Sequence, residues 1–560
     1  MPRAIDLLRQ GRNEELWQMC CGFLSLNINE FMDIQKRLLV QQLELLNNCA
    51  LGKKIMRGAK PQTVEEFRQQ VPLTSYKDYC PELLDKNEDI LPLKTDIWAH
   101  SSGRTGEYPC KWVPLSGEYA KELSEILYGI GMISCSRDWG DTSRIPKNLK
   151  LLYSVARRPY ISGVFADLLT RQTPMEYMPS LEDSDDLTFE ERIKAGFELA
   201  MSDGLDYFFG LSLVLVKVGE KIRDASGKVD IRPYMLHPRA LLRLARGKIR
   251  SRIAGRPMLP RDLWSVRGII GSGIDSSVYK NKIRELWGTS PLDLYSCTEG
   301  GVIATQTWDY DGMTFIPNLN FLEFISDDEN IKWQMDHSYK PKTLLLDEVE
   351  DGENYEIVIS NFHGGAMVRY RLGDMVRITA LRNEKLGINI PQMAFERRVD
   401  DLIDFNVIRI TEKLIWQSLE KSGIEYEDWF AYREPGQQTL RFYLEPKNGF
   451  QYNEQTVAAI LYDKMTRAED EFTSSSTHDD LMKMVGFNIE VKFLPRGTFT
   501  NYTAMRQAEG ADLAHLKPPH VNPPQKVLDM LTAETEETII VTKTGSKVPE
   551  KPGVEKVTII

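Results

Sequence analysis

Apolar residues recur at helical spacing near the start of this 560-residue chain, between residues 31 and 46. Residues three or four positions apart share one face of a helix, so this spacing predicts a helix with a buried stripe. The stripe consists of Phe31, Ile34, Leu38, Leu39, Leu43 and Leu46. Prolines at positions 61, 72 and 81 then interrupt the helical pattern.

Short apolar runs alternate with longer helical stretches in the middle of the chain. Residues 151–155 and Ile269-Ile270 are typical of buried strands, whereas residues 283–287 belong to a helical stretch. This alternation predicts an α/β fold. Farther along, residues 355–359 predict a strand, and residues 370–374 predict a turn into the next strand.

The pattern changes again after residue 400. Residues 440–444 and 489–493 alternate apolar with polar positions, which predicts strands, and residues 457–461 between them predict a helix. A small α+β domain of about 130 residues accounts for these elements. The end of the chain is rich in Thr, Glu, Lys and Val without helical periodicity, which indicates a flexible tail.

These patterns predict three parts. They are a large α/β domain over residues 1–398, a small α+β domain over residues 399–531, and a flexible tail over residues 532–560.

Composition and charge narrow the classes of function. The chain has 42% hydrophobic and 27% charged residues, as folded globular proteins do. Its net charge of -11 argues against nucleic acid or an anionic membrane as a partner. The longest apolar stretch, residues 205–216, is too short to span a bilayer. Seven cysteines without a CxxC pair, and a start without a signal-peptide pattern, lead us to expect a cytoplasmic protein.

The densest chemical signal is the run Ser101-Ser102-Gly103-Arg104-Thr105-Gly106. Small hydroxylated residues and glycines allow backbone N–H groups and hydroxyls to converge on phosphate oxygens. The run lacks the Gly-Lys-Ser/Thr ending of a Walker loop, and a plain Gly-Ser turn would also explain it.

Three further motifs follow in order, and each alone has a structural explanation. Residues 295–301 (YSCTEGG) offer a carboxylate, the hard oxygen ligand that Mg²⁺ requires, although a Glu after a strand is commonly a solvated turn residue. Residues 370–374 (YRLGD) offer an aspartate that accepts two hydrogen bonds, or simply a turn. Residues 397–403 (RRVDDLI) combine two arginines with two aspartates, which a surface ion-pair cluster would explain.

Taken together and in this order, the motifs resemble those of the adenylate-forming superfamily, and specifically its auxin-responsive (Gretchen Hagen) acyl acid amido synthetases. The phosphate loop is followed by Lys111, Val113, Pro114 and Ser116, as in that family. Residues 71–79 (VPLTSYKDY) and 495–502 (PRGTFTNY) also resemble family segments. The sequence departs from the family at Arg104 and Glu107 in the loop, at residues 108–110, and at His520 in place of a frequent Arg.

The resemblance implies a large adenylate-forming domain, a small lid domain, and a set of site residues for ATP and Mg²⁺. The phosphates of ATP would be bound by Ser101, Ser102, Gly103, Thr105 and Gly106. Tyr295 would flank the adenine, Thr298 would meet the phosphates in catalysis, and Glu299 would hold Mg²⁺. Asp374 would bind the ribose. Residues 397–403 would form the hinge about which the small domain rotates, and Arg398 within it would complete the nucleotide site. Lys517 would be the catalytic lysine that reaches the acyl-adenylate site when the small domain closes.

The implied activity is adenylation of a carboxylic acid followed by acyl transfer to the amine of an amino acid. Two alternatives remain open, an acyl-CoA ligase of the same superfamily and a non-catalytic nucleotide-binding regulator, the latter because of Arg104 and Glu107. A thiol enzyme based on Cys297 has less support, because no histidine stands at a signature spacing. The oligomeric state cannot be read from the sequence.

Overall fold

The computed structural model describes most of the chain up to residue 532. The described residues are 2–101, 111–145, 148–184, 187, 189–225, 237–272, 276–336, 338–398, 402–404, 409–433, 438–466, 487–508, 518–523 and 525–532.

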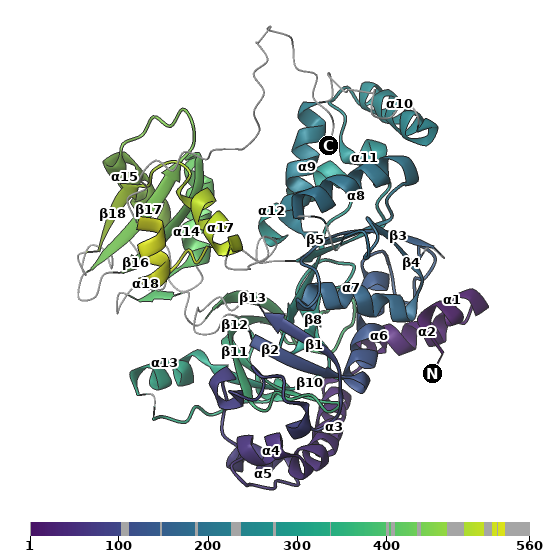
Figure 1. Ribbon diagram of the computed structural model, residues 1–560, viewed down its shortest axis with the longest axis vertical. Coiled ribbons are helices and arrows are strands. Elements are labelled where there is room, and N and C mark those ends of the chain that lie inside the picture. Colours follow the sequence, from purple (N-terminus) through teal and green to yellow (C-terminus); the bar gives the residue numbers. More distant parts are fainter. Residues whose placement is uncertain are drawn as a thin grey trace.

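Helices precede the first strands in the chain (Figure 1). They are α1 (Ala4–Gln10), α2 (Asn13–Cys21), η1 (Gly22–Ser25), α3 (Ile28–Asn48), α4 (Ala50–Ile55), α5 (Val64–Gln70), η2 (Tyr76–Tyr79) and η3 (Glu88–Ile90). A two-stranded antiparallel hairpin of β1 (Thr95–Ser101) and β2 (Lys111–Ser116) follows and runs directly into α6 (Gly117–Ile133).

An 11-stranded sheet forms the centre of the molecule, in the order β10-β11-β12-β13-β9-β8-β7-β6-β5-β3-β4. Its strands are β3 (Leu149–Ser154), β4 (Met175–Met178), β5 (Tyr207–Leu211), β6 (Gly268–Ser272), β7 (Leu292–Cys297), β8 (Gly301–Thr305), β9 (Met313–Phe315), β10 (Asn320–Ser326), β11 (Asn354–Asn361), β12 (Tyr370–Ala380) and β13 (Gln392–Arg398). Strands β4, β3, β5, β6 and β7 pair in parallel, whereas the rest pair antiparallel. The two halves meet at β7, which is parallel to β6 and antiparallel to β8.

Helices connect the strands of the parallel half, as the predicted alternation requires. They are α7 (Ile161–Gln172), α8 (Phe189–Asp203), α9 (Ser212–Asp224), α10 (Pro238–Ile253), α11 (Pro260–Leu263) and α12 (Ser276–Trp287). In the antiparallel half lie α13 (Asp327–Met335) and η5 (Leu346–Glu348). The predicted α/β fold is therefore confirmed.

The elements from residue 402 onward form two sheets and two apolar clusters of their own. They are β14 (Leu402–Asp404), β15 (Arg409–Thr411), α14 (Glu412–Ser422), β16 (Tyr426–Arg433), β17 (Thr439–Pro446), α15 (Glu454–Thr466), β18 (Asn488–Phe493), α17 (Thr498–Ala508) and α18 (Gln525–Thr532). Strand β17 pairs antiparallel with β16 and parallel with β18, and the predicted alternation and helix are confirmed. No helix in the described part of the chain has the length and apolar character needed to cross a bilayer.

The predicted stripe on α3 is buried except for the half-buried Ile34, and two polar residues share its face. Gln35 donates to the backbone oxygens of Pro317 and Asn320 at 2.6 and 2.7 Å. Gln42, two turns later, donates to Gly365 O at 3.0 Å and accepts from Gly364 N at 2.8 Å. Because buried polar groups need partners, these glutamines fix the position of α3 against the sheet.

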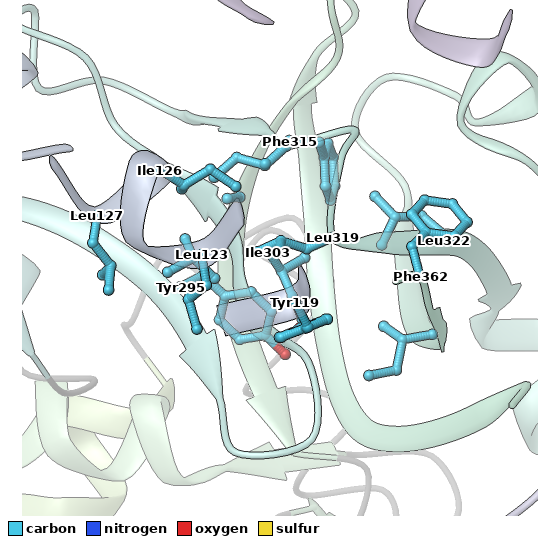
Figure 2. Packing of buried hydrophobic residues seen from close by; sticks show 14 of the residues in the cluster. Tyr119, Leu123, Ile126, Leu127, Tyr295, Ile303, Phe315, Leu319, Leu322 and Phe362 are labelled. Carbon is cyan, nitrogen blue, oxygen red and sulfur yellow. The ribbon is translucent and has the colours of Figure 1, made fainter. Parts of the chain in front are cut away.

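Apolar side chains fill both faces of the parallel half. Neighbouring residues alternate between two clusters, so that Tyr207 and Phe209 pack on one face and Phe208 on the other. Figure 2 shows Leu123 and Ile126, which belong to α6, beside Tyr295 and Ile303 from β7 and β8. Helix α6 therefore packs against β7 at the junction between the two halves of the sheet.

One prediction from the sequence is wrong. Residues 370–374 form no turn but begin the long strand β12. Three residues, 372–374, stand where β11 has one, since Arg371 pairs with Val358 and Met375 with Glu356. This bulge includes Gly373 at φ +71°, a conformation that glycine adopts without strain. The Gly-Asp pair that suggested a turn produces a bulge instead, because strand pairing continues on both sides of it.

A buried ion pair joins the N-terminal helices to the start of β12. Arg369 and Glu323 are 6% and 1% exposed and lie 2.7 Å apart. All five guanidinium N–H groups have partners, because Arg369 donates twice to Glu323, once to Thr343 Oγ1, and to the carbonyls of Arg68 and Val71. The backbone beside it completes the contact, since Thr74 N donates to Arg369 O and Arg371 N donates to Thr74 O.

We expect Glu323→Gln to destabilise the protein strongly. The change leaves the buried Arg369 guanidinium without a counter-charge, which costs about 3–5 kcal/mol. Urea unfolding measures this loss. Glu384→Gln is the matched control, because it removes the same charge from an ion pair with Arg382 whose side chains are 62% and 71% exposed, and it should change stability by about 0.5 kcal/mol or less. Equal effects of the two variants would contradict the role given to the buried pair.

Candidate functional site

Tyr295 lies near the end of β7 and is buried at the junction of the two sheet halves. Its hydroxyl donates to Asp374 Oδ2 at 2.9 Å, and its ring stacks on Phe395 with centroids 6.2 Å apart. Burial, and next the charge of Asp374, raise the pKa of Tyr295 well above its ordinary value. The phenol therefore stays protonated and serves as a fixed donor to the carboxylate.

Asp374 occupies the bulge of β12 and is 6% exposed. Its Oδ1 atom lies 3.1 Å from Arg398 Nε, and the two residues are paired across β12 and β13. Although this distance makes an ion pair, no group in the described residues reaches Oδ1 with hydrogen-bond geometry. A buried carboxylate oxygen with unused acceptor capacity fits a ligand hydroxyl, as a ribose would supply.

The turn after β7 places Thr298 and Glu299 beside strands β10 and β11. Asn361 Nδ2 donates to Glu299 O at 2.9 Å, and Asn320 Nδ2 donates to Gly300 O at 2.7 Å. Gly301 follows at φ +62°, where an added Cβ would lie 2.9 Å from the Tyr119 hydroxyl. The turn is thus held by two asparagine side chains and needs glycine where it enters β8.

The Glu299 side chain has one described hydrogen bond, from the Tyr370 hydroxyl to Oε1 at 3.3 Å. Burial, and next the charge of Glu299, raise the pKa of Tyr370 well above its ordinary value, so this donor keeps its proton. No group of three or more His, Cys, Asp or Glu side chains suited to a metal occurs among the described residues. A single carboxylate still fits Mg²⁺, which completes its shell with water and substrate phosphates.

Ser101 ends β1 and is the Cα partner of Lys111, the first residue of β2. This hairpin is fixed on two sides. His100 N donates to Pro159 O at 2.9 Å, and the Tyr76 hydroxyl bonds to both the N–H and the carbonyl of Trp112, at 2.7 and 3.1 Å. The phosphate-loop residues Ser102, Gly103, Thr105 and Gly106 lie outside the described residues, as do Arg104 and Glu107.

The predicted site residues thus fall into two groups. The structure brings together Tyr295, Asp374 and Arg398 by direct contact, and it places Thr298 and Glu299 on the adjoining turn. Lys517 and the acidic pair Asp400 and Asp401 of the hinge motif lie outside the described residues.

Three residues of this region escaped the sequence analysis. Phe395 contacts Tyr295, and Asn320 and Asn361 hold the turn. No local signal singled out the asparagines, because β10 and β11 contain further polar residues such as Glu323 and Glu356. Nothing in the local sequence marks Phe395 as the partner of a tyrosine a hundred positions earlier.

The thiol of Cys297 does not suit catalysis. Burial, and next the charge of Glu299, raise its pKa well above the ordinary value. Its Sγ atom accepts a hydrogen bond from Gly300 N at 3.2 Å, within the turn. A thiol that resists ionisation is a poor nucleophile, so the geometry argues against a thiol enzyme.

His520 holds the segment after Lys517 onto strand β16. Its ring nitrogens lie 2.7 Å from Glu412 Oε1 and 2.8 Å from Asp428 Oδ1, and the ring stacks on Trp429 with centroids 4.7 Å apart. Its carbonyl accepts from Ala431 N at 2.7 Å. Burial lowers the pKa of His520, but the hydrogen bonds and charges of Asp428 and Glu412 outweigh it and raise the pKa to about 9. A charged imidazolium thus binds two carboxylates here.

We expect this histidine to make stability depend on pH between about 6.5 and 9. Because the pKa of His520 is higher in the folded than in the unfolded protein, its contribution to the free energy of unfolding is complete below pH 6.5. This contribution is lost as the pH rises through about 9. The difference in unfolding free energy between the native protein and His520→Gln should therefore shrink across this range, by up to about 3 kcal/mol. Urea unfolding of both proteins at several pH values measures it.

The matched control is His237→Gln, since His237 is exposed. That variant should track the native protein at every pH. If the stability of His520→Gln also followed that of the native protein at every pH, a charged His520 between Glu412 and Asp428 would be contradicted.

Comparisons with known proteins relate parts of this sequence to one protein family. Residues 22–173 match the model of the GH3 family N-terminal domain, and residues 313–398 match that of the GH3 family central domain. A 4-substituted benzoates–glutamate ligase of Arabidopsis thaliana is 26% identical over 247 residues, 41% of this chain and 39% of that protein. A jasmonoyl–L-amino acid synthetase of Oryza sativa subsp. japonica is 26% identical over 300 residues, 48% of each chain. The matches therefore span less than half the length of these curated relatives.

Solved structures extend the likeness of fold to most of the chain. An acyl acid amido synthetase in complex with 2,4-DB superposes with a TM-score of 0.60 at 15% identity, covering 91% of this chain and 94% of that one. A 2-hydroxyisobutyryl-CoA ligase in the postadenylation state gives 0.55 at 14% identity, with 90% and 91% covered. Two segments of the chain, residues 22–173 and 313–398, are thus similar to GH3 family domains, and most of the chain has the fold of these two solved structures.

Proposed function

We propose that the protein activates a carboxylic acid with ATP and transfers the acyl group to the amine of an amino acid, forming an amide. The observation that carries the proposal is Asp374 Oδ1, a buried carboxylate oxygen with no hydrogen bond from the described residues, beside the buried Tyr295. An acceptor of this kind suits the hydroxyls of the ATP ribose. The relatives, named as ligases and amido synthetases, give the proposal its reaction class.

In the first step, a carboxylate oxygen of the acid attacks the α-phosphorus of ATP. The new P–O bond forms as the bond from the α-phosphorus to pyrophosphate breaks, which yields an acyl-adenylate. Ser101, Ser102, Gly103, Thr105 and Gly106 would hold the phosphates, with Thr298 close by. Glu299 would hold Mg²⁺, which supplies positive charge to the leaving pyrophosphate. Asp374, with Tyr295 and Arg398, would fix the nucleoside half, so the contribution of these residues is positioning.

In the second step, the neutral amine of the acceptor attacks the acyl carbon. The C–N bond forms, the C–O bond to AMP breaks, and the amine loses a proton to solvent.

Lys517 would stabilise charge on the phosphate in the adenylation state. We propose that rotation of the domain at 399–531 against the domain at 1–398, with its hinge at 398–401, exchanges the two states.

The relatives support the classes of substrate. Their names give benzoates, jasmonic acid and indole-3-acetic acid as acids and amino acids as acceptors. We propose an apolar, ring-containing carboxylic acid and an amino acid as the substrates. We also propose a cytoplasmic location, since all six described cysteines are free thiols, as a reducing compartment favours.

We expect Asp374→Asn to impair ATP binding in the adenylation step. The neutral amide replaces one acceptor oxygen by donors, so a charge-assisted hydrogen bond worth about 1.5–3 kcal/mol is lost and the KM for ATP should rise about 10- to 100-fold. The assay is carboxylate-dependent exchange of labelled pyrophosphate into ATP, with aryl, indolyl, jasmonate-like and fatty acids and no amine. Asp351→Asn, an exposed aspartate in the turn before β11, is the matched control and should leave the KM unchanged.

A second prediction concerns the metal. We expect Glu299→Gln to raise the Mg²⁺ concentration needed for half-maximal exchange about tenfold or more, because an amide oxygen is a weaker ligand than a carboxylate. Titrating MgCl₂ at saturating ATP measures the shift. Glu350→Gln, at an exposed position between η5 and β11, should leave the titration unchanged. An unaltered titration in Glu299→Gln would remove Glu299 from the metal site.

The same exchange assay separates the alternatives. Exchange with one class of acid, followed by amide formation on adding amino acids, supports the proposal. Thioester formation with coenzyme A and no amide would make the protein an acyl-CoA ligase. ATP binding without exchange for any acid would favour a regulator.

A further inference from the structure

Helix α10 (Pro238–Ile253) lies at the outer edge of the molecule, beyond α8 and α11 (Figure 1). One face of it is buried and consists of Ala240, Leu244, Gly247 and Ser251. Gly247 allows a close approach, since a Cβ there would lie 2.7 Å from the Leu263 side chain. The inner face is therefore fixed against the protein, and the opposite face points outward.

The outward face carries large apolar side chains. Leu242, Ile249 and Ile253 are 62%, 58% and 82% exposed. Their spacing of seven and four residues places them on one side of the helix, opposite the buried face. Single exposed apolar residues are ordinary, but three aligned on one helix form a stripe that water solvates poorly.

The same helix is strongly basic. It contains six cationic residues and no acid, although the whole chain has a net charge of -11. The cations are Arg239, Arg243, Arg246, Lys248, Arg250 and Arg252. Arg243 and Arg250 also bind backbone carbonyls of the protein, of Met201 and Asp262. The other four are exposed, and none of them takes part in an ion pair with the described residues.

We propose that α10 binds to the surface of membranes that contain anionic lipids. The apolar stripe would enter the boundary between headgroups and acyl chains, and the flanking cations would reach lipid phosphates and carboxylates. Long basic side chains suit this arrangement, because their aliphatic stems lie along the apolar boundary while the charges stay at the headgroups.

Charge complementarity favours a bilayer over other occupants. A second copy placed on this face by a two-fold axis would bring six cations against six cations, which repel. The face offers no acidic side chain that would fix the register of a folded protein partner. A fluid anionic surface requires no register and accepts apolar and cationic side chains side by side.

This inference revises the expectation drawn from the overall charge. A net charge of -11 argues against an anionic surface only if the charge is evenly spread. Here six basic residues and no acidic one lie on a single peripheral helix, so the acidic remainder of the surface would be repelled and the contact would be confined to α10. The protein would then be held in one orientation on the membrane.

The test is co-sedimentation of the full-length protein with vesicles. Vesicles of phosphatidylcholine alone are compared with vesicles that also hold about 30% phosphatidylserine, at low and at high salt. We expect binding to the anionic vesicles at least about tenfold tighter than to the neutral ones, weakened by salt.

Two variants separate the contributions of charge and apolar surface. Arg246→Gln/Lys248→Gln should reduce binding to anionic vesicles by about tenfold or more. Leu242→Ser/Ile249→Ser should reduce the binding that remains at high salt. The matched control is Lys36→Gln/Arg37→Gln, a pair of exposed cations on α3, which should leave binding unchanged.

Several outcomes would overturn the proposal. They are equal binding to both kinds of vesicle, no binding to either, or an equal loss of binding in the α3 control. A change in oligomeric state caused by the α10 variants, measured by size-exclusion chromatography without vesicles and accompanied by no vesicle binding, would assign the face to a second copy instead. Because pyrophosphate exchange is measured without lipid, failure of this proposal leaves the proposed function untouched.

Discussion

The ion pair between Arg369 and Glu323 is the constraint on which the candidate site depends. A guanidinium buried to this degree is tolerated only when every N–H has a partner, and here the partners come from three separate parts of the chain. They are strand β10, the segment that contains Thr343, and the end of α5 with the residues after it. Tyr370 follows Arg369 directly and Asp374 comes four residues later, so the pair sets where β12 begins and hence where its bulge places the aspartate.

The location of the site follows from the change of sheet type at β7. Strand β7 is parallel to β6 and antiparallel to β8, so its end lies between the parallel and the antiparallel half of the sheet. Tyr295 comes from that strand, Asp374 from β12 and Arg398 from β13, while the asparagines of β10 and β11 hold the following turn. The site is thus assembled from rigid strands, with positive φ angles at Gly373 in the bulge of β12 and at Gly301 after the turn that holds Thr298 and Glu299.

The sequence predicts those features that depend on local periodicity or on residue order. Helix α3, the parallel strands β3 and β6, and β17, α15 and β18 of the C-terminal part were predicted, because their apolar residues follow a helical or strand-like pattern. The strand at residues 370–374 was missed because a Gly-Asp pair serves a bulge as well as a turn, and only the pairing of β12 with its neighbours decides between them. The contact of Tyr295 with Phe395 and the partners of Arg369 were beyond reach, since they join residues that only the folded sheet brings together.

The positions of charges in the folded molecule were also beyond the reach of the sequence analysis. His520 stood out only as a departure from a family pattern, yet between Glu412 and Asp428 it carries the positive charge that an arginine would bring. The cations of α10 vanish in the net charge of an acidic chain, although on the folded molecule they share one peripheral helix with an apolar stripe. In both cases the physical effect arises from where charges are placed relative to one another, because electrostatic energies fall with distance and depend on burial. Composition bounds what a protein can do, but the arrangement of its charges decides where on the molecule it does so.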